Sequence, residues 1–343
     1  MKFDWISLML AALLNAVIAV NFAFMPAAVA QALEPLAMSY LPGNAIAWDL
    51  DVAMDKGFFK AEGFDGKPVV FQNAPQLAQM LITGEVQLGT GQIDPFLLAI
   101  RSGARDIAVI AAPADRPDWF INVRPEIKSV ADLKGKFVAT AALQVGESWL
   151  TATWINEHGL KPQDWSFLVV GTTALKFAAL QRGSVAAAIL FQPLAVEAQL
   201  SGYPTFYRFL DGKPLPPVLY VVNRQWAAQK ERGSRLSRAI VQSHKWLLDP
   251  VNRNEAIAIL QKYTKRETPV MEAVYDLFIG KDRLYTQDAA VNVTGVNTEI
   301  ATMIEKGVVP PSTTMLPPGL LAAARARRPL PVTATLAGVV IAT

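Results

Sequence analysis

Short apolar runs alternate with longer segments of helical periodicity along most of the chain. Residues 36–38 and 67–71 are two such runs, and each is followed by a polar turn and then by apolar residues spaced three and four apart. Strands that alternate with helices in this way are typical of βα units and of a parallel sheet. The pattern therefore predicts an α/β fold.

The spacing of apolar and polar segments changes near Asp118, where a second series of expected strands begins. The expected strands are 36–38, 67–71, 86–88, 107–112, 119–123, 137–140, 167–170, 185–191 and 218–222. The expected helices include 46–54, 75–84, 95–102, 148–157, 174–181, 225–248, 253–263, 269–278 and 288–305. We expect the chain to leave the first lobe near Asp118 and to return to it after the Pro-rich loop 211–217. The predicted organisation is 31–118 for the first part of lobe 1, 119–215 for lobe 2, 216–311 for the return to lobe 1 with C-terminal helices, and 312–343 for a poorly ordered tail.

The N-terminal segment has the layout of a secretory signal. Lys2 precedes a long apolar stretch, and Ala28 and Ala30 match the small residues of a cleavage site. We expect residues 1–30 to be a signal peptide, the mature chain to begin near Gln31, and the protein to be periplasmic. An uncleaved membrane anchor stays open, because the segment is long enough to span a bilayer.

Composition narrows the class of protein. The chain has 343 residues, of which 52% are apolar and 18% charged, and this suits two well-packed domains. A net charge of only +3 with scattered basic residues gives no support for nucleic-acid binding. The absence of cysteine excludes disulfides, thiolate metal sites and a thiol nucleophile.

A ligand is expected at the turns that follow strands and precede helices. In open α/β sheets ligands bind beyond the carboxyl ends of the strands, where helix N-termini present unpaired backbone N–H groups. Helix capping by the hydroxyl residues, and core packing for the tryptophans, are the competing interpretations. The candidate ligand-binding residues are Tyr40, Asn44, Gln72, Gln92, Trp119, Gly146, Glu147, Ser148, Thr172, Thr173 and Gln192.

The charge of the ligand stays open at this point. Converging helix N-termini favour an anion, and Lys176 and Arg116 would add positive charge. Glu147 argues for an amine or an amino-substituted ring instead, unless it is solvated or only favourable to its helix dipole. Trp48, Trp119 and Trp149 fall near the same turns and would suit a flat aromatic ligand.

Three sequence motifs resemble a known family. The first is the segment 48–64, in which a helix ends in Lys-Gly-Phe-Phe and Glu-Gly-Phe follows. The others are the helix 76–84 followed by Glu85-Val86, and the connector 127–136, Ile-Lys-Ser-Val-Ala-Asp-Leu-Lys-Gly-Lys. Over roughly 36–311 the chain is similar to the solute-binding proteins of ABC importers for sulfonates, nitrate, taurine and thiamine-type pyrimidines.

The resemblance implies a type II periplasmic-binding-protein fold: two α/β lobes, each a mostly parallel sheet flanked by helices. It also implies a small solute held between the lobes, delivery to a permease and ATPase complex in the inner membrane, and neither metal nor cofactor. We expect a monomer.

An enzyme on the same fold is the alternative. Thiamine-pyrimidine synthases share this architecture and rely on clustered histidines and cysteines, and the lack of cysteine disfavours that activity here. His158 and His244 stand among polar neighbours and are expected at the surface. Asp51 and Asp55, four residues apart on one helix, are expected on a solvated face.

Overall fold

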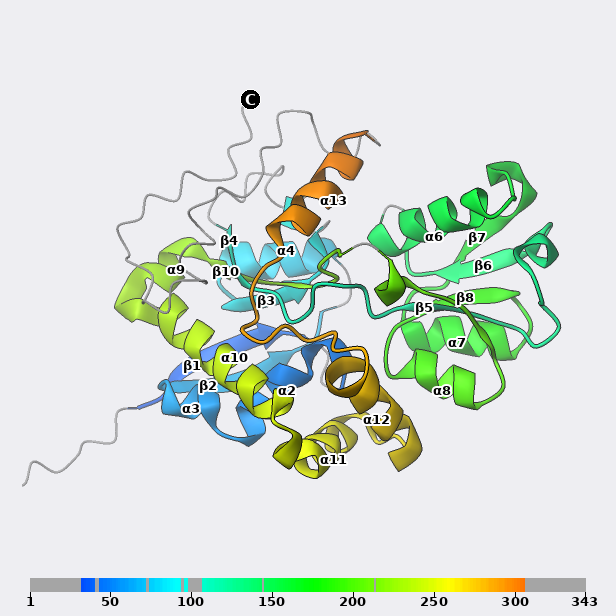
Figure 1. Cartoon of the computed structure of the whole chain (residues 1–343). Coiled ribbons are helices and arrows are strands. Elements are labelled where there is room, and N and C mark those ends of the chain that lie inside the picture. Colours follow the sequence, from blue (N-terminus) through cyan, green and yellow to red (C-terminus); the bar gives the residue numbers. More distant parts are fainter. Residues whose placement is uncertain are drawn as a thin grey trace, which may run out of the picture. The chain divides into compact units, whose positions relative to one another are not determined.

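The computed structural model describes residues 32–40, 43–71, 74–93, 96–97, 107–143, 145–212 and 214–305 (Figure 1). The predicted signal peptide 1–30 and the predicted tail 312–343 lie outside these residues. None of the helices within them is long and apolar enough to cross a membrane.

Strands from two distant parts of the chain form the first sheet. Its strands are β1 (Glu34–Ser39), β2 (Phe64–Val69), β3 (Leu88–Gly91), β4 (Ile107–Ala111) and β10 (Leu219–Asn223), in the order β2-β1-β3-β10-β4. β1 pairs parallel to β3, whereas β10 lies between β3 and β4 and is antiparallel to both. The last strand in sequence is therefore an inner strand of this sheet.

The second sheet has the same strand order but comes from one continuous stretch of chain. Its strands are β5 (Phe120–Val123), β6 (Phe137–Thr140), β7 (Ser166–Val169), β8 (Ala187–Leu190) and β9 (Thr205–Arg208), in the order β7-β6-β8-β5-β9. β6 is parallel to β7 and β8, and β5 is antiparallel to β8 and β9. The α/β prediction is confirmed, with one antiparallel strand in fourth place in each sheet.

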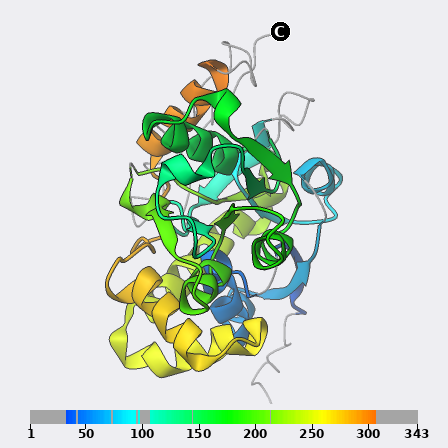
Figure 2. The ribbon, with the colours of Figure 1, turned by 90° about the vertical axis from the view of Figure 1, so that its right-hand side faces the viewer.

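Helices cover both faces of each sheet (Figures 1 and 2). The helices near the first sheet are α2 (Trp48–Asp55), α3 (Phe58–Ala61), α4 (Ala74–Thr83), α9 (Arg224–Ala228), α10 (Arg232–Leu248) and α13 (Val293–Glu305). Those near the second are α6 (Gly146–Glu157), α7 (Thr173–Gln181), α8 (Leu194–Leu200) and α12 (Thr268–Tyr275), and α11 (Arg253–Thr264) packs on α2 and α12. In Figure 1, α6 lies on one face of the second sheet and α7 and α8 on the other.

Strand β10 shows how the period of two divides the core. Tyr220 and Val222 pack with α2 and α10 on one face, whereas Leu219 and Val221 pack with α4 and α13 on the other. Both faces are buried, so the strand reads as a continuous apolar run.

A third hydrophobic cluster joins the second sheet to helices that lie outside it. It contains Phe120 and Leu190 of the second sheet, Trp48 of α2, and Val274 and Phe278 from the C-terminal helices. Helix α8 packs directly on α12. The second sheet therefore shares part of its core with segments that follow it in the sequence.

Several expectations about elements are wrong. The expected strand 86–88 lies two residues too early, because β3 spans Leu88–Gly91. A single helix was expected over 225–248, but the chain breaks between α9 and α10, where Lys230 and Glu231 have φ of 49° and 54°. Gly233 makes the break compatible with packing, because a Cβ there would lie only 3.2 Å from the Cβ of Ala227. Strand β9 was not expected, because Thr205–Arg208 is half-buried throughout and neither alternates nor forms an apolar run.

Two side chains expected at the surface are buried instead. His244 is fully buried in α10: its Nδ1 donates to the Thr286 carbonyl at 2.7 Å, and its Nε2 lies 3.0 Å from Asp49 Oδ2. Asp51 is also buried and accepts hydrogen bonds from the Tyr40 hydroxyl and the Gly43 amide. Burial needs such partners, which no local pattern reveals. The surface placement is confirmed for His158.

Candidate functional site

Four buried polar side chains gather at the carboxyl edge of the second sheet. Asp118 lies two residues before β5, Glu147 lies in the first turn of α6, Lys176 lies in α7, and Gln192 follows β8. Their exposed fractions are 0%, 1%, 1% and 2%. We call these four residues the carboxyl-edge cluster.

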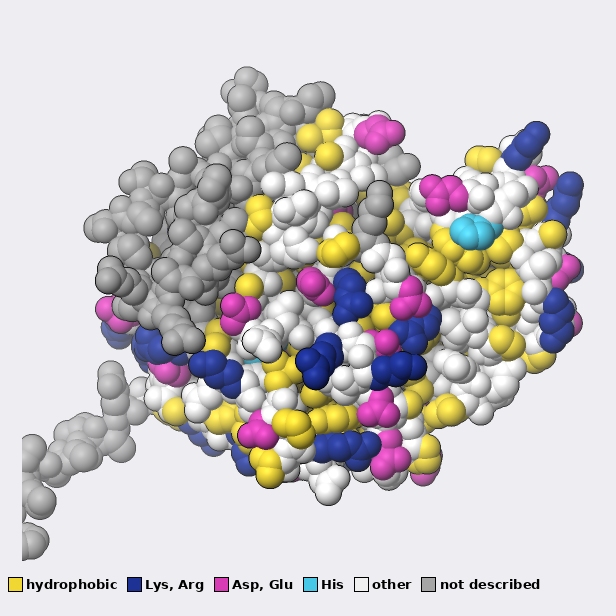
Figure 3. Space-filling view, viewed as in Figure 1, with side chains coloured by type: hydrophobic (Ala, Val, Ile, Leu, Met, Phe, Trp, Pro, Cys, Tyr) yellow, Lys and Arg dark blue, Asp and Glu magenta, His cyan; other side chains and the backbone are white. Residues whose placement is uncertain are grey.

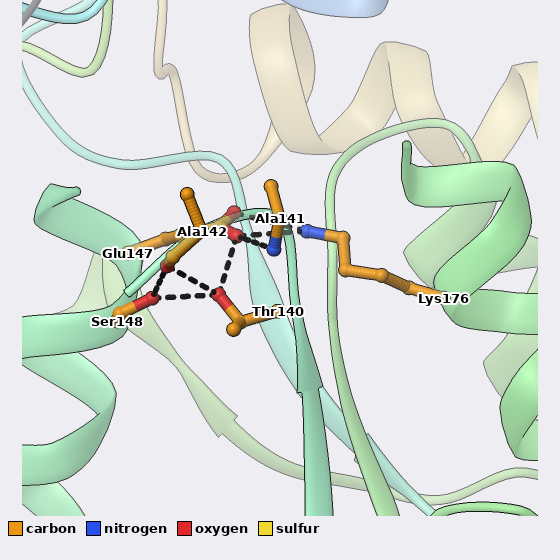
Figure 4. A network of polar contacts seen from close by, with 6 residues as sticks. All are labelled: Thr140, Ala141, Ala142, Glu147, Ser148 and Lys176. Atoms are coloured by element: carbon orange, nitrogen blue, oxygen red, sulfur yellow. Dashed lines mark hydrogen bonds and ion pairs between the residues drawn. The ribbon is translucent and has the colours of Figure 1, made fainter. Parts of the chain in front are cut away.

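Glu147 is held by a dense set of donors (Figure 4). Lys176 Nζ lies 2.9 Å from its Oε2 and 3.1 Å from its Oε1, and the Thr140 hydroxyl and the Ala141 amide donate to Oε1 at 2.9 and 2.8 Å. Charge-assisted bonds of this kind are what a buried carboxylate requires. Glu147 is therefore buried, and its oxygens already bind protein donors, so they are not free to bind a cationic ligand.

The lysine of this pair is fully enclosed. Its ammonium lies 4.9 Å from the ring centre of Phe191, in addition to its contact with Glu147. Burial lowers the pKa of Lys176, and the negative charge of Glu147 opposes that shift. Its positive charge is already matched by Glu147.

Ser148 and Thr172 act on the backbone. The Ser148 hydroxyl donates to the Ala142 carbonyl at 2.5 Å and lies 2.6 Å from the Thr140 hydroxyl, so it fastens the loop between β6 and α6 (Figure 4). Thr172 caps α7 by accepting a hydrogen bond from the Leu175 amide. The exposed Thr172 and half-buried Thr173 stand at the start of α7, one turn before Lys176.

Asp118 and Gln192 have polar atoms without hydrogen bonds to any described residue. Both carboxylate oxygens of Asp118 and the Gln192 Nε2 are buried in this state, whereas Gln192 Oε1 accepts from the Val196 amide at 3.2 Å. The backbone amides of Asp118 and Gln192 lie close enough to the carboxylate to lower its pKa, but neither forms a hydrogen bond of normal geometry with it. Burial raises the pKa of Asp118 to about 7, although these amides and Lys176 pull it down.

Residues that follow β1 contact the carboxyl-edge cluster. The Ala45 amide donates to the Gln192 carbonyl at 3.4 Å, and Asn44 caps the short helix Ala45–Ala47 by accepting from the Ile46 amide. Gln92 is half-buried directly after β3. Tyr40 is not brought to the cluster, because its buried hydroxyl donates to Asp51 at 2.9 Å inside the first sheet's core.

The first turn of α6 also meets a carboxylate from α13. A Cβ placed on Gly146 would lie 3.1 Å from Glu299 Oε1, and Glu299 is 9% exposed. The missing side chain of Gly146 thus allows Glu299 to approach the N-terminus of α6. A negative charge is favourable there.

The structure brings together Trp119, Gly146, Glu147, Ser148 and Gln192 from the sequence-predicted set. Trp119 packs on Phe191 and Phe209, with ring centres 5.1 and 5.8 Å apart. Gln72 lies outside the described residues. Trp48 and Trp149 do not form one aromatic surface with Trp119. Trp48 is buried and donates to the Ala256 carbonyl, and Trp149 packs on the hydrophobic residues of α4 and α13.

Sequence reasoning missed Asp118 and Glu299 as candidates. The sequence did contain a signal for Asp118, because this charged residue directly precedes the expected strand 119–123 at an expected crossing between the lobes. Glu299 had none, because it occupies an ordinary helical position. Arg116, considered as a source of positive charge, donates to the carbonyls of Leu210 and Asp282 instead.

Other parts of the described chain offer weaker sites. A surface hollow lies at the opposite edge of the first sheet, and its lining carries no charged side chain. It is lined by Ile82, Thr83, Gly84, Val86, Gln87, Asn223, Gln225, Trp226 and Gln229. No group of three or more histidines and carboxylates placed to hold a metal occurs among the residues described.

Comparison with solved structures identifies the fold. The periplasmic aliphatic sulphonate binding protein SsuA from Escherichia coli is 23% identical with a TM-score of 0.64, covering 81% of this chain and 94% of that one. The periplasmic nitrate-binding protein NrtA from Synechocystis PCC 6803 is 16% identical with a TM-score of 0.68, covering 85% of each chain. The desulfurization enzyme DSZB is 17% identical with a TM-score of 0.60, covering 80% of this chain and 93% of that one.

Comparison of sequences identifies the family. The NMT1/THI5 like family model matches residues 49–252, whereas no curated protein matches the chain. The sulphonate- and nitrate-binding neighbours agree with the resemblance found in the sequence, which is confirmed. The family model covers more than half of the chain, which therefore belongs to the NMT1/THI5-like family and has the two-lobed α/β fold of the periplasmic binding proteins.

Proposed function

We propose that this protein is the solute-binding component of an ABC importer. It would capture a small molecule at the carboxyl-edge cluster, between that edge and the residues that follow β1, and deliver it to a membrane permease. The observation that carries the proposal is the set of buried polar atoms of Asp118 and Gln192, which lack partners among the described residues where ligands bind in α/β sheets. Buried polar groups without partners in a native protein call for an explanation, and a ligand supplies one.

The contact between Ala45 and Gln192 supports binding with closure. This single backbone hydrogen bond, at 3.4 Å, joins a segment after β1 to the end of β8. Breaking it would expose Gln192 and give a solute access to Asp118. We therefore infer that the solute enters when this contact opens and that the contact re-forms around it.

Several predicted residues complete the proposed site. Asn44 and Gln92 would contribute from the first sheet, and Gly146, Thr173 and Gln192 from the second. Thr172 and Ser148 would position the helix starts. The signal segment 1–30, the periplasmic location and the boundary of the second lobe at 119–215 belong to the same proposal.

Catalysis is the weaker candidate. The likeness to DSZB shows a shared fold only, because the two chains are 17% identical. The chain contains no cysteine, so a thiol nucleophile is excluded. We propose that the solute is bound and released unchanged.

The test is a thermal-shift screen of the purified chain without residues 1–30. The screen uses sulfonates, nitrate, taurine, aromatic carboxylates, pyrimidines, polyamines and amidines, and every stabilising compound is recovered and weighed by mass spectrometry. We expect at least one compound to raise Tm and to be recovered intact. Conversion of a stabilising compound into a product would contradict the proposal, as would the absence of stabilisation by any compound.

Location and partner need a second experiment in cells. We expect the full chain to fractionate with the periplasm and the ligand found above to enter cells only when the chain and its permease are both present. Uptake that is unchanged on deletion of the chain would contradict the importer role.

A further inference from the structure

We propose that the site selects a planar cation of the amidinium or guanidinium type and rejects sulfonate and nitrate. The Asp118 carboxylate would pair with the N–H groups of the cation, and Gln192 Nε2 would donate to an oxygen elsewhere on the solute. This inference rests on the proposed function and specifies its substrate class.

The charges of the described cluster favour a cation. Asp118 and Glu147 are carboxylates, and Lys176 supplies one positive charge that already contacts both oxygens of Glu147. With both carboxylates ionised, the cluster carries one uncompensated negative charge, located on Asp118. A monovalent cation would neutralise it, whereas an anion would add a second unpaired charge in a buried place.

The N-terminus of α6 is already supplied with negative charge. Glu147 lies in its first turn, and Glu299 Oε1 approaches Gly146 closely enough to contact any side chain placed there. A sulfonate at this helix start would have to displace or neighbour both carboxylates. The helix dipole that attracts an anion in principle is therefore used by the protein's own residues.

The geometry of the unpartnered atoms fits a planar donor. Both oxygens of Asp118 are buried without hydrogen bonds from the described residues, and a carboxylate with two open oxygens accepts two parallel N–H bonds from an amidinium or guanidinium. Trp119 follows Asp118 directly and packs with Phe191 and Phe209, so flat apolar surface lies close by. Lys176 and Glu147 are the other charged groups that act on Asp118.

The test compares two probes that share a phenyl ring and carry opposite charges. Benzamidine and benzenesulfonate both carry one planar ring, and each is titrated into the mature chain by calorimetry at pH 8, with nitrate as a third probe. We expect benzamidine to bind and the two anions to show no binding. Binding of benzenesulfonate or nitrate without binding of benzamidine would overturn the cation inference and leave the solute-binding function standing.

Two variants localise the cation. Asp118→Asn is expected to weaken benzamidine binding at least tenfold, whereas Asp115→Asn, which removes a partly exposed carboxylate from the same crossing segment, is expected to leave it unchanged. Equal binding by the wild type and Asp118→Asn, with both variants folded by circular dichroism, would place the cation elsewhere and refute the proposal.

A pH series tests the wild type without any substitution. Benzamidine stays cationic between pH 6 and 8, but Asp118 must lose its proton to pair with it, and burial holds the pKa of Asp118 near 7. Affinity should therefore rise about tenfold from pH 6 to pH 8. A flat profile, or no benzamidine binding at any pH, would overturn the inference. In the second case, the wider screen of solutes still decides whether the protein binds a solute at all.

Discussion

At the scale of single residues, the pairing of Lys176 with Glu147 is the strongest electrostatic feature of the site. Each side chain is 1% exposed, so each charge depends on the other. Removing one partner leaves the second charge buried and uncompensated, which is far more damaging than removing both.

We expect Lys176→Met to lower the free energy of unfolding by about 3–5 kcal/mol. The double variant Lys176→Met, Glu147→Gln should recover part of this loss, because Glu147 is then no longer left as an unpaired buried charge. Lys262→Met is the matched control: its ion pair with Asp55 is at the surface, and its loss should cost less than about 1 kcal/mol. Urea denaturation at pH 7 measures all three, and equal effects of the two lysine variants would contradict the buried pair.

The buried Asp118 makes stability depend on pH with a definite sign. Burial raises its pKa from 3.8 to about 7, so the folded state binds more protons than the unfolded state between these values. The contribution of Asp118 to stability is therefore present at acid pH and is lost as the pH rises from about 4 to 7. Asp51, whose pKa burial also raises to about 7, acts in the same direction.

We expect Asp118→Asn to become more stable relative to the wild type as the pH rises. The difference between their free energies of unfolding should grow by an amount on the order of 4 kcal/mol from pH 4 to pH 8, since one pKa unit corresponds to about 1.4 kcal/mol. Denaturation curves at half-unit pH intervals give this difference directly. A constant difference across the series would show that Asp118 ionises normally.

Residue types pointed to helix starts but not to the residues that cap them. Capping was the competing interpretation for Ser148 and Thr173, whereas the structure shows Thr172 and Asn44, both predicted as ligand-binding residues, as the caps. The side-chain partners of Glu147 come from positions 7 and 29 residues away. No local sequence pattern contains those contacts, so the buried ion pair could not be predicted from the sequence.

At the scale of elements, His244 ties α10 to two separate segments. One ring nitrogen donates to Thr286 and the other faces Asp49 of α2, whose second oxygen accepts from the Tyr220 hydroxyl at 2.6 Å. Helix α10 and helix α2 are in contact along the same face of the first sheet. The histidine thus links this helix pair to the segment that follows α12.

We expect His244→Leu to cost about 3–5 kcal/mol of stability, because it removes the partner of Asp49 Oδ2 and of a backbone carbonyl, and only the Tyr220 hydroxyl still donates to the Asp49 carboxylate. His158→Leu is the natural control, since His158 is exposed in the turn after α6 and should cost less than about 1 kcal/mol. Thermal unfolding followed by circular dichroism compares the two. A similar small shift for both histidines would contradict the buried network.

Element-scale prediction was best for strands with a strong apolar run. The expected strands 107–112 and 137–140 agree with β4 and β6 within one residue. The break before α10 was missed because left-handed backbone at Lys230 and Glu231 goes against the preference of both residues. Tertiary packing through Gly233 overrides that preference.

At the scale of the whole molecule, the two sheets share a strand order that the sequence did not reveal. Alternating strands and helices predicted parallel pairing, but nothing in the pattern marked β5 and β10 as antiparallel inner strands. Both follow a crossing from one sheet to the other.

We expect the fragment 119–215, expressed alone, to fold but to be less stable than the intact chain. All strands of the second sheet lie within it, from β5 to β9. Its α8, however, loses the contact with α12, and Phe120 and Leu190 lose neighbours in the shared cluster. Circular dichroism should show a cooperative transition at lower Tm with increased dye binding to apolar surface. An unfolded fragment would show that the second sheet depends on the first.

The inner position of β10 also bears on how the chain is made. Strands β3 and β4 leave the ribosome long before β10, which must insert between them to complete the first sheet. Until residue 223 emerges, both strands present open edges that can pair with other chains, whereas the second sheet is complete once residue 208 has emerged. The order of synthesis is therefore opposite to the order of completion: the sheet whose strands are made first is completed last.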